Sequence, residues 1–467
     1  MAGSLLNRKS IVAFEADLAA EGRSLRRALG AADLVLLGIG CIIGTGIFVL
    51  TGVAAVHHAG PAVIASYAIA GIVCALAALC YSEFATMLPI SGSAYSYAYA
   101  TLGELVAWII GWDLILEYAL AASAVAVGWS GYARDILTGF GIDLPTAIAG
   151  SPGTLSGAVF NLPAFLILLL MTALLVVGIR ESARANAIIV AIKLFVVFFV
   201  IAVGGFYVTP DNWSPFAPFG LQGVVTGAAT VFFAYIGFDA VTTAAEEARD
   251  PERDMTIGII GSLAACTVLY LAVAAVVTGM VPLDQIDTAA PVAQAFRSHG
   301  LDFAGGLISA GAIAGLSSVL LVLLLGQSRI FFSMSRDGLL PGLFSAIHPR
   351  FGTPHVATIG VGLIVAVIAG FVPLKELAEL ANIGTLFAFV VVSIGILVLR
   401  RTEPDRPRPF RTPWVPLLPL VAAAGAFWLM AALPKETWIR FLIWLGIGLV
   451  VYFAYSRHHS RVGRASG

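Results

Sequence analysis

The sequence predicts an all-α integral membrane protein with twelve transmembrane helices, of which the first and the sixth are broken. Composition is the first reason, because 59% of the 467 residues are hydrophobic and 11% are charged, whereas a soluble domain carries about 25% charged residues. The second reason is that apolar segments of membrane-spanning length recur along the chain. The third is glycine at the middle of two of these segments, which disfavours a continuous helix.

The apolar segments place the expected helices, since about 20 apolar residues are needed to cross a bilayer. The predicted spans are 33–57, 62–87, 102–130, 160–179, 187–208, 222–245, 256–280, 303–333, 355–371, 377–399, 414–432 and 438–456. Segments rich in turn-forming residues, such as 210–215 and 404–409, separate them.

Lys and Arg residues predict the orientation, because positively charged loops stay on the cytoplasmic side. With the N-terminus inside, twenty of the 26 Lys and Arg residues lie in cytoplasmic segments and five in external ones. We therefore expect a multi-pass plasma-membrane protein whose two termini are cytoplasmic. The polar first 32 residues lack the apolar region of a cleavable signal peptide, so none is expected.

The glycines of the first span predict a break in its helix. Residues 38–48 read GIGCIIGTGIF, with four glycines in nine residues, and each costs a helix about 1 kcal/mol relative to alanine. A broken helix leaves backbone groups that protein or ligand must satisfy. Free N–H groups can then bind a carboxylate, and free carbonyls can bind an ammonium group. The alternative is that these glycines only allow close helix packing.

The sixth span carries a glycine and a carboxylate at its middle, Gly237 and Asp239. It lies five spans after the first broken one, as expected if units 33–208 and 222–400 form a five-plus-five inverted repeat. This symmetry rests on spacing alone. Outside it lie an N-terminal segment (1–32), two additional helices (414–456) and a C-terminal tail (457–467).

Ionisable residues within spans need a reason, because each costs at least about 2.5 kcal/mol to insert. Lys193 is the only basic residue deep in a span. Burial favours the neutral form of an amine, so Lys193 is a candidate proton-coupling site, with snorkelling to the interface as the alternative. Glu117 is expected to attract a cationic side chain or relay charge, unless it only pairs with a polar neighbour. Asp239 is expected to organise the second break, and Asp113 is expected to be structural.

The remaining patterns argue against other classes of protein. A net charge of −1 argues against nucleic acid as a partner. The four cysteines and seven histidines have no metal-ligand spacing. No nucleophile–base arrangement, P-loop or dinucleotide motif stands out. We therefore expect neither catalytic residues nor a cofactor or metal.

Three motifs resemble one family. They are IIGTGIF (42–48), FFAYIGFD (232–239) followed by EEARDP (246–251), and SR (328–329) followed by SRDGLLP (335–341). The sequence resembles the amino acid–polyamine–organocation (APC) superfamily, and specifically the bacterial cationic amino acid transporters. The resemblance covers about 24–455 and implies a leucine-transporter-like five-plus-five inverted repeat, with two additional helices.

The resemblance also implies a substrate site at the two breaks. The substrate carboxylate is expected at the N–H groups of Gly44, Thr45 and Gly46. The substrate amino group is expected at carbonyls that lie beside the breaks, namely those of Ile42, Ile43, Phe233, Ala234 and Ile236.

Three further roles follow from the resemblance. Lys193 matches a lysine that replaces the sodium ion of sodium-coupled relatives. Glu117 matches an acidic position associated with cationic side chains. Leu323 is the expected pocket-facing residue of the eighth span, where a bulky apolar side chain favours a small neutral amino acid such as alanine over arginine or lysine.

The expected function is proton-coupled amino acid import by alternating access, with an amino acid and a proton as partners in the lipid bilayer. One alternative is an exchanger without proton coupling. Another is an amino acid sensor or binding protein of the same fold. Dependence on a small membrane subunit stays open.

Overall fold

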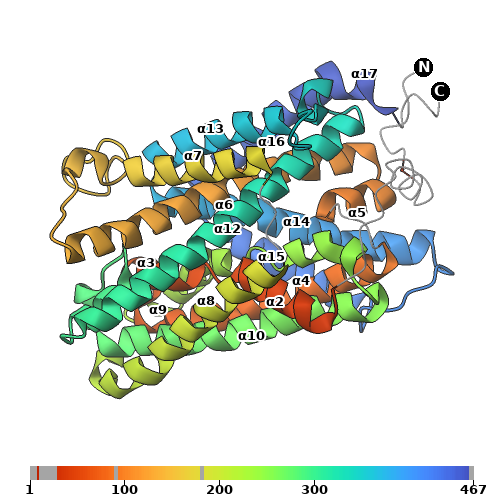
Figure 1. Ribbon diagram of the computed structural model, residues 1–467. Coiled ribbons are helices and arrows are strands. Elements are labelled where there is room, and N and C mark those ends of the chain that lie inside the picture. The colour runs from red at the N-terminus through yellow and green to blue at the C-terminus, as the bar shows by residue number, and fades with distance from the viewer. Residues whose placement is uncertain (1–7, 10–28, 89–92, 179–182, 462–467) are drawn as a thin grey trace.

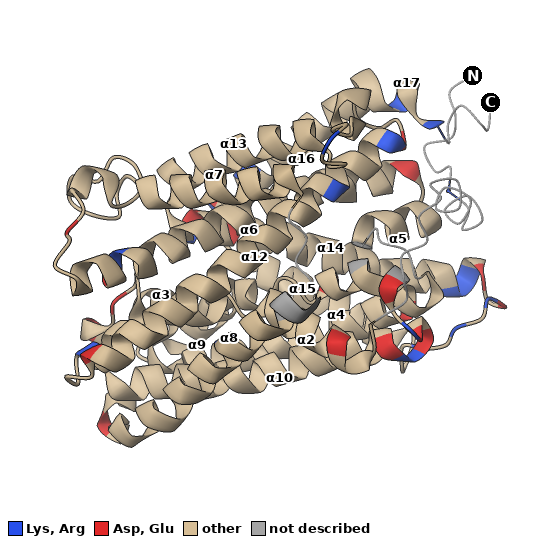
Figure 2. Ribbon diagram, viewed as in Figure 1, with Lys and Arg blue, Asp and Glu red and all other residues tan. Residues whose placement is uncertain are grey.

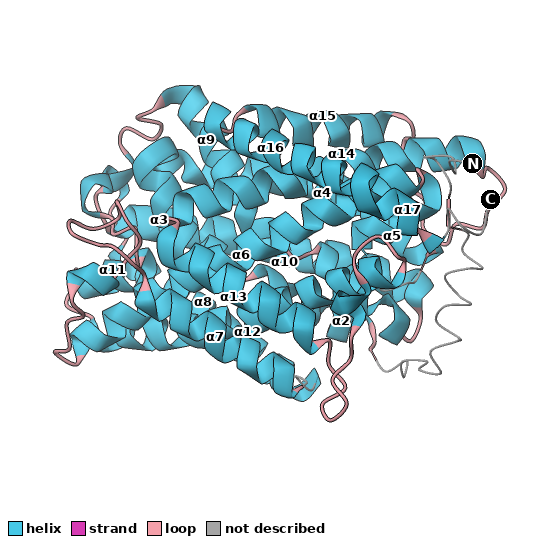
Figure 3. Ribbon diagram, turned by 90° about the horizontal axis from the view of Figure 1, so that it is seen from above, coloured by secondary structure: helices cyan, strands magenta, loops and turns pink. Residues whose placement is uncertain are grey.

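The helices lie side by side and run along the long dimension of the molecule (Figure 1). This computed structural model describes residues 8–9, 29–88, 93–178 and 183–461. Most loops and turns gather at the two ends of the helices (Figure 3). Charged residues also lie mainly at these two ends, and the middle of the bundle is largely uncharged (Figure 2). This distribution is typical of a protein whose middle lies in hydrocarbon.

The following bounds define the helices, and segments named η are short 3₁₀ or π helices. The first half of the chain forms α2 (Ala31–Ile42), η1 (Gly46–Leu50), α3 (Thr51–Ala54), η2 (Ala55–Ala59), η3 (Gly60–Ala62), α4 (Val63–Met87), α5 (Ser93–Thr101), α6 (Glu104–Gly139), η4 (Thr146–Ile148), α7 (Leu162–Val177), α8 (Ala183–Gly204), η5 (Gly205–Tyr207) and η6 (Pro210–Trp213). The second half forms α9 (Gly220–Val231), η7 (Phe232–Tyr235), η8 (Asp239–Glu247), α10 (Pro251–Met280), η9 (Leu283–Gln285), α11 (Pro291–Arg297), α12 (Asp302–Arg336), η10 (Gly342–Ser345), α13 (His355–Phe371), α14 (Leu374–Thr402), α15 (Leu417–Ala431), α16 (Lys435–Val451), η11 (Tyr452–Ser456) and α17 (Arg457–His459).

Eight helical stretches of the described residues are long and apolar enough to cross a membrane. Four shorter apolar helices accompany them, α2, α7, α13 and α15. The first two predicted spans are not separated by a loop, because 60–62 form a 3₁₀ turn that joins them into one helical run from Gly46 to Met87. The count of twelve spans stays a prediction.

Long central helices build the interior. α6 packs against α12 and α14, while α10 packs against α2 and α4. α8 lies beside α12, α10 and α2. Close approach depends on small residues, as expected between membrane helices. A Cβ atom on Gly326 of α12 would lie 2.6 Å from the Tyr118 ring of α6.

The two ends of the bundle differ in their ion pairs. α5 and α17 lie at one end (Figure 1), where Lys9 Nζ donates to the Asp337 carboxylate at 2.7 Å. We call this the Asp337 end. α11 lies at the opposite end (Figure 3), where Arg297 pairs with Asp135 at 2.9 Å.

A buried carboxylate fixes the connection between α14 and α15. Glu83 of α4 is fully buried and accepts two hydrogen bonds from Arg400, at 2.8 and 2.9 Å. It also accepts from the Thr412 backbone N–H at 2.8 Å, and Arg408 Nε lies 3.2 Å away. The loop after α14 is therefore held against α4 by one carboxylate.

We expect Glu83→Ala to be strongly destabilising, because it leaves two guanidinium groups without their buried counter-charge. Removing one partner of a buried pair costs about 3–5 kcal/mol. Thermal unfolding in detergent should show a clearly lower midpoint. Glu403→Ala, which removes only the partly exposed pair with Arg406, is the matched control and should change the midpoint little. Equal midpoints for the two variants would contradict this account.

Candidate functional site

Two helices are interrupted inside the bundle. α2 ends at Ile42, Ile43 leaves helical geometry with ψ 102°, and the helical run resumes at Gly46. In the sixth predicted span, Ile236 has ψ 132° and the helix resumes at Asp239. Gly237 between them has φ 111°, a conformation that side-chain-bearing residues rarely adopt. Both breaks lie where the glycine pattern predicts them.

The two breaks lie against each other. A Cβ atom on Gly46 would lie 2.3 Å from the Ala234 Cα, and one on Gly237 would lie 3.1 Å from the Cys41 carbonyl. Gly46 has no room for a side chain, and at Gly237 a side chain would press on the Cys41 carbonyl. The sequence left open whether the glycines break the helix or only allow close packing. The structure shows both, since the same glycines interrupt the helices and let them pack closely.

Tyr270 of α10 joins the two breaks. Its hydroxyl lies 2.8 Å from the Ile42 carbonyl and 2.7 Å from the Ala234 carbonyl. A tyrosine hydroxyl has one hydrogen to donate, so the two carbonyls share one donor. Both were predicted to bind the substrate amino group. Each keeps acceptor capacity, because a carbonyl oxygen has two lone pairs.

Two more tyrosines support this junction. Tyr67 donates to the Gly46 carbonyl at 2.8 Å, and Tyr235 donates to the Tyr67 carbonyl at 2.9 Å. The ring centroids of Tyr67 and Tyr235 each lie 5.4 Å from that of Tyr270. This aromatic cluster packs behind the breaks and fixes their separation.

The other side of the first break offers donors. The backbone N–H groups of Gly44 and Thr45 donate to no acceptor among the described residues. The Thr45 hydroxyl is buried and also has no hydrogen-bond partner in the described part of the chain. It lies against α6, where a Cβ atom on Gly128 would be 3.0 Å from it. Unpaired donors at the start of a helical run form an arrangement that can bind an anion.

Lys193 of α8 contacts the first broken helix directly. Its side chain is fully buried, and Nζ donates to the Gly40 carbonyl at 2.7 Å. Gly40 lies in the last turn of α2, where carbonyls lose their helical partners. On the other side, a Cβ atom on Gly315 of α12 would lie 3.1 Å from the lysine chain. Lys193 therefore does not snorkel to the surface.

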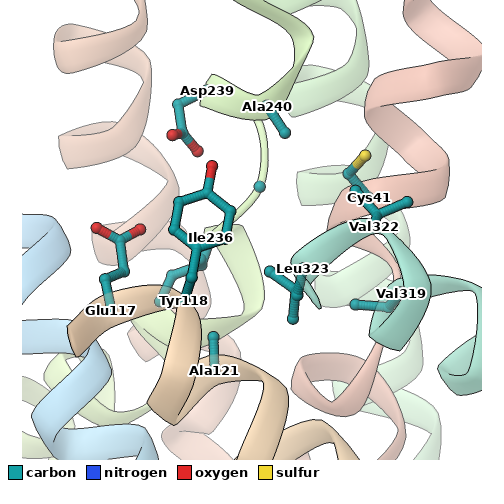
Figure 4. A pocket seen from close by; sticks show the side chains of 11 residues that line it. Cys41, Glu117, Tyr118, Ala121, Ile236, Asp239, Ala240, Val319, Val322 and Leu323 are labelled. Carbon is teal, nitrogen blue, oxygen red and sulfur yellow. The ribbon is translucent and has the colours of Figure 1, made fainter. Parts of the chain in front are cut away.

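A small cavity lies beside the breaks, between α6 and α12 (Figure 4). Four of the predicted site residues line it, Glu117, Ile236, Asp239 and Leu323. Its volume of about 10 Å³ corresponds to roughly one water molecule. The cavity must therefore expand before it can hold an amino acid.

The cavity has an acidic and an apolar part. Figure 4 shows the carboxylates of Glu117 and Asp239 on one side, with the Tyr118 hydroxyl pointing toward Asp239. Leu323 and Val319 of α12 lie on the other side (Figure 4). The sequence analysis missed several lining residues, which are Cys41, Tyr118, Ala121, Gly237, Ala240, Val319 and Val322. Helical spacing from Glu117 and Leu323 could have identified Ala121 and Val319, four residues away.

The other predicted site residues lie at the breaks without lining this cavity. They are Ile42, Ile43, Gly44, Thr45, Gly46, Phe233 and Ala234. Asp113, predicted to be structural, is fully buried. Its carboxylate lies against α14, where a Cβ atom on Gly384 would be 2.7 Å away. No hydrogen-bond partner for it occurs among the described residues.

We expect Tyr270→Phe to weaken the junction between the breaks. The variant keeps the ring but removes the donor that the carbonyls of Ile42 and Ala234 share. A buried group left unpaired costs about 1–3 kcal/mol, so the melting temperature in detergent should fall. Tyr207→Phe, at a half-buried tyrosine outside the cluster, is the control. A Tyr270→Phe variant that melts like the wild type would show that another group satisfies these carbonyls.

Comparison with known proteins agrees with this architecture. Residues 29–454 match the family model described as amino acid permease. The chain is 52% identical to the methylthioribose transporter of Bacillus subtilis, over 99% of this chain and 100% of the relative. It is also 52% identical to the branched-chain amino acid permease BcaP of the same organism, over 99% and 100%. Cationic amino acid transporter 4, vacuolar, of Arabidopsis thaliana is 40% identical over 86% of this chain and 68% of the relative.

The family match extends over nearly all of the described residues, and two relatives are identical at more than half of their positions. These relatives are transporters by name, in agreement with the expectation that this protein is not an enzyme. The chain belongs to the amino acid permease family of the APC superfamily and is an integral membrane transporter, not an enzyme.

Proposed function

We propose that this protein imports a small neutral amino acid by alternating access, coupled to protons. The observation that carries the proposal is the pair of broken helices, which meet with a buried lysine bonded to the first. Units 33–208 and 222–400 form the inverted repeat in this proposal. Helices in 414–456 add two spans, and the segments 1–32 and 457–467 lie in the cytoplasm beneath the plasma membrane.

The substrate carboxylate binds at the start of the second half of the first span. Gly44, Thr45 and Gly46 supply backbone N–H groups there, and Thr45 supplies its hydroxyl. Two facts support this assignment, namely the unpaired N–H groups of Gly44 and Thr45 among the described residues and the orphaned hydroxyl. A helix start favours negative charge through its dipole and its free donors.

The substrate amino group binds across the two breaks, at carbonyls from both. Those of Ile42 and Ala234 are 2.8 and 2.7 Å from the Tyr270 hydroxyl. Each of these carbonyl oxygens has a second lone pair, so it can accept from the substrate ammonium group while it keeps its contact with Tyr270. Further acceptors are the carbonyls of residues beside the breaks, Ile43, Phe233 and Ile236.

The substrate side chain points into the cavity between α6 and α12. Leu323 and Val319 narrow its apolar part, which supports a short side chain. Glu117 and Asp239 line the acidic part. The named relatives transport methylthioribose, branched-chain or cationic amino acids, so family membership alone does not choose the substrate.

Lys193 provides the coupling. In its charged form, Nζ donates to the Gly40 carbonyl and holds the end of α2. A hydrogen bond from a charged donor contributes about 1–1.5 kcal/mol more than one from a neutral donor, so loss of the proton weakens this hold about 5- to 10-fold. α2 then moves away from the break and releases the substrate. Proton and substrate therefore act on the same half-helix.

We expect a pH gradient to drive alanine uptake into proteoliposomes and Lys193→Met to abolish this response. Methionine keeps the apolar volume but cannot bind the proton. Lys435→Met, at the first residue of α16, is the matched control and should retain the gradient response. Wild-type uptake that ignores the gradient would contradict proton coupling. Counterflow without gradient dependence would favour an exchanger, and binding without flux would favour a sensor.

Thermal shifts with the twenty amino acids should show alanine stabilising the wild type more than arginine or lysine. Leu323→Ala removes the side chain that narrows the cavity, so longer substrates should gain stabilisation relative to alanine. Leu325→Ala removes a leucine from the exposed face of the same helix and should leave the ranking unchanged. Arginine stabilising the wild type far better than alanine would refute the role of Leu323.

A further inference from the structure

The segment after α16 lies at the Asp337 end of the bundle, where it continues the helical run from Lys435 to His459. It consists of η11, α17 and residues up to Arg461, and we call it the strap. Three of its hydroxyl-bearing residues, Tyr452, Ser456 and Ser460, are at most 1% exposed. These three residues recur every fourth position, so one face of the strap is buried against other helices while much of the rest is exposed.

The strap contacts the first residue of α6. Glu104 is buried and accepts a hydrogen bond from Tyr452 at 3.0 Å and a short one from Ser460. The same carboxylate accepts from Tyr99 of α5 at 3.1 Å. One buried acid therefore connects the strap with α5.

The strap also contacts the loop that follows α12. Ser456 donates to the Leu339 carbonyl at 2.6 Å, and the Arg461 N–H donates to the Asp337 carbonyl at 3.1 Å. The Asp337 carboxylate accepts from Lys9 and from Tyr95 of α5, each at 2.7 Å. Asp337 is therefore a second buried acid that connects the strap with α5.

α5 connects these two acids with the second break. Tyr95 and Tyr99 lie one turn apart on α5 and donate to Asp337 and Glu104, respectively. α5 packs against η8, the half-helix that brings Asp239 and Ala240 to the cavity. The strap thus holds the helix that supports one wall of the site.

The strap has a fixed anchor on α6. The indole N–H groups of Trp112 and Trp444 each donate to the other residue's carbonyl, at 2.9 and 3.0 Å. Trp108 donates to the Gly448 carbonyl at 2.9 Å. The second half of α16 is therefore bound to α6. The polar contacts of the strap beyond it can break while this anchor stays in place.

We propose that the strap is a latch that keeps the Asp337 end of the transporter closed. Its bonds to Glu104 and Leu339 must break before α5 and the η8 that it supports can move away from the cavity and the site can open toward that end. This inference rests on the proposed alternating access, and it assigns the last helical run of the chain a role in that motion.

The test measures access to Cys41, which lines the cavity from the last turn of α2. Purified protein in nanodiscs reacts with a membrane-impermeant maleimide, and mass spectrometry follows modification of the Cys41 peptide. The double variant Tyr452→Phe/Ser460→Ala removes both strap donors to Glu104. We expect its modification rate to rise about tenfold, because both hydrogen bonds to a charged acceptor are lost and only part of their contribution is expressed in opening.

Two controls define the result. Tyr455→Phe changes a tyrosine of the same segment whose ring stacks on His459 at 4.1 Å, and its rate should equal that of the wild type. Cys41→Ala should remove the signal. A double variant that reacts no faster than the wild type would overturn the latch. If the double variant does not fold, Ser456→Ala takes its place, and the same equality would overturn it.

Modification does not require transport, so the two proposals fail separately. Faster modification together with absent uptake would refute the transport proposal and keep the latch. Gradient-driven uptake together with an unchanged rate of Cys41 modification would refute the latch and keep the transport proposal.

Discussion

The contact between the two broken helices is the constraint on which the rest of the structure depends. The Gly46 backbone lies against Ala234 with no space for a side chain. The Tyr270 hydroxyl then spans the carbonyls of Ile42 and Ala234. Unpaired backbone groups are costly in an apolar interior, and Tyr270 supplies the hydrogen bond that the two interruptions share. The donors left over at Gly44 and Thr45 are the part of this junction that a substrate can use.

Much of this arrangement could be predicted from sequence where the signal is local. Clustered glycines disfavour a continuous helix, so the first break follows from residues 38–48, and the second is indicated by Gly237 beside Asp239 five spans later. Lys193 stands out because its neighbours along the chain are apolar. Tyr270 could not be found in this way, because a tyrosine in an apolar helix shows no preference until its partners from other helices are known. The joining of the first two spans was missed because the 3₁₀ turn at 60–62 looks like a loop.

A cavity of about 10 Å³ means that the site is closed in this conformation. Three sets of contacts surround the closed site. They are the tyrosine cluster behind the breaks, Lys193 on the end of α2, and the strap on Glu104 and Leu339. In our proposals, opening requires Lys193 and the strap to release while the tyrosine cluster stays intact. The reason is what each group contacts. Tyr270 bonds to both breaks, whereas Lys193 bonds only to the first, and the strap bonds to neither.

Recognition of a zwitterion by the backbone of two broken helices is the central claim, and ligand-induced thermal stabilisation tests it most directly. The purified protein is melted in the presence of alanine, alaninamide or methylthioribose at equal concentration. Alaninamide keeps the ammonium group and side chain but lacks the carboxylate that Gly44, Thr45 and Gly46 are proposed to bind. Stabilisation by alanine, with little by the other two compounds, is the predicted result. Equal stabilisation by alanine and alaninamide would contradict the account, and stabilisation by methylthioribose alone would assign the site to a different substrate.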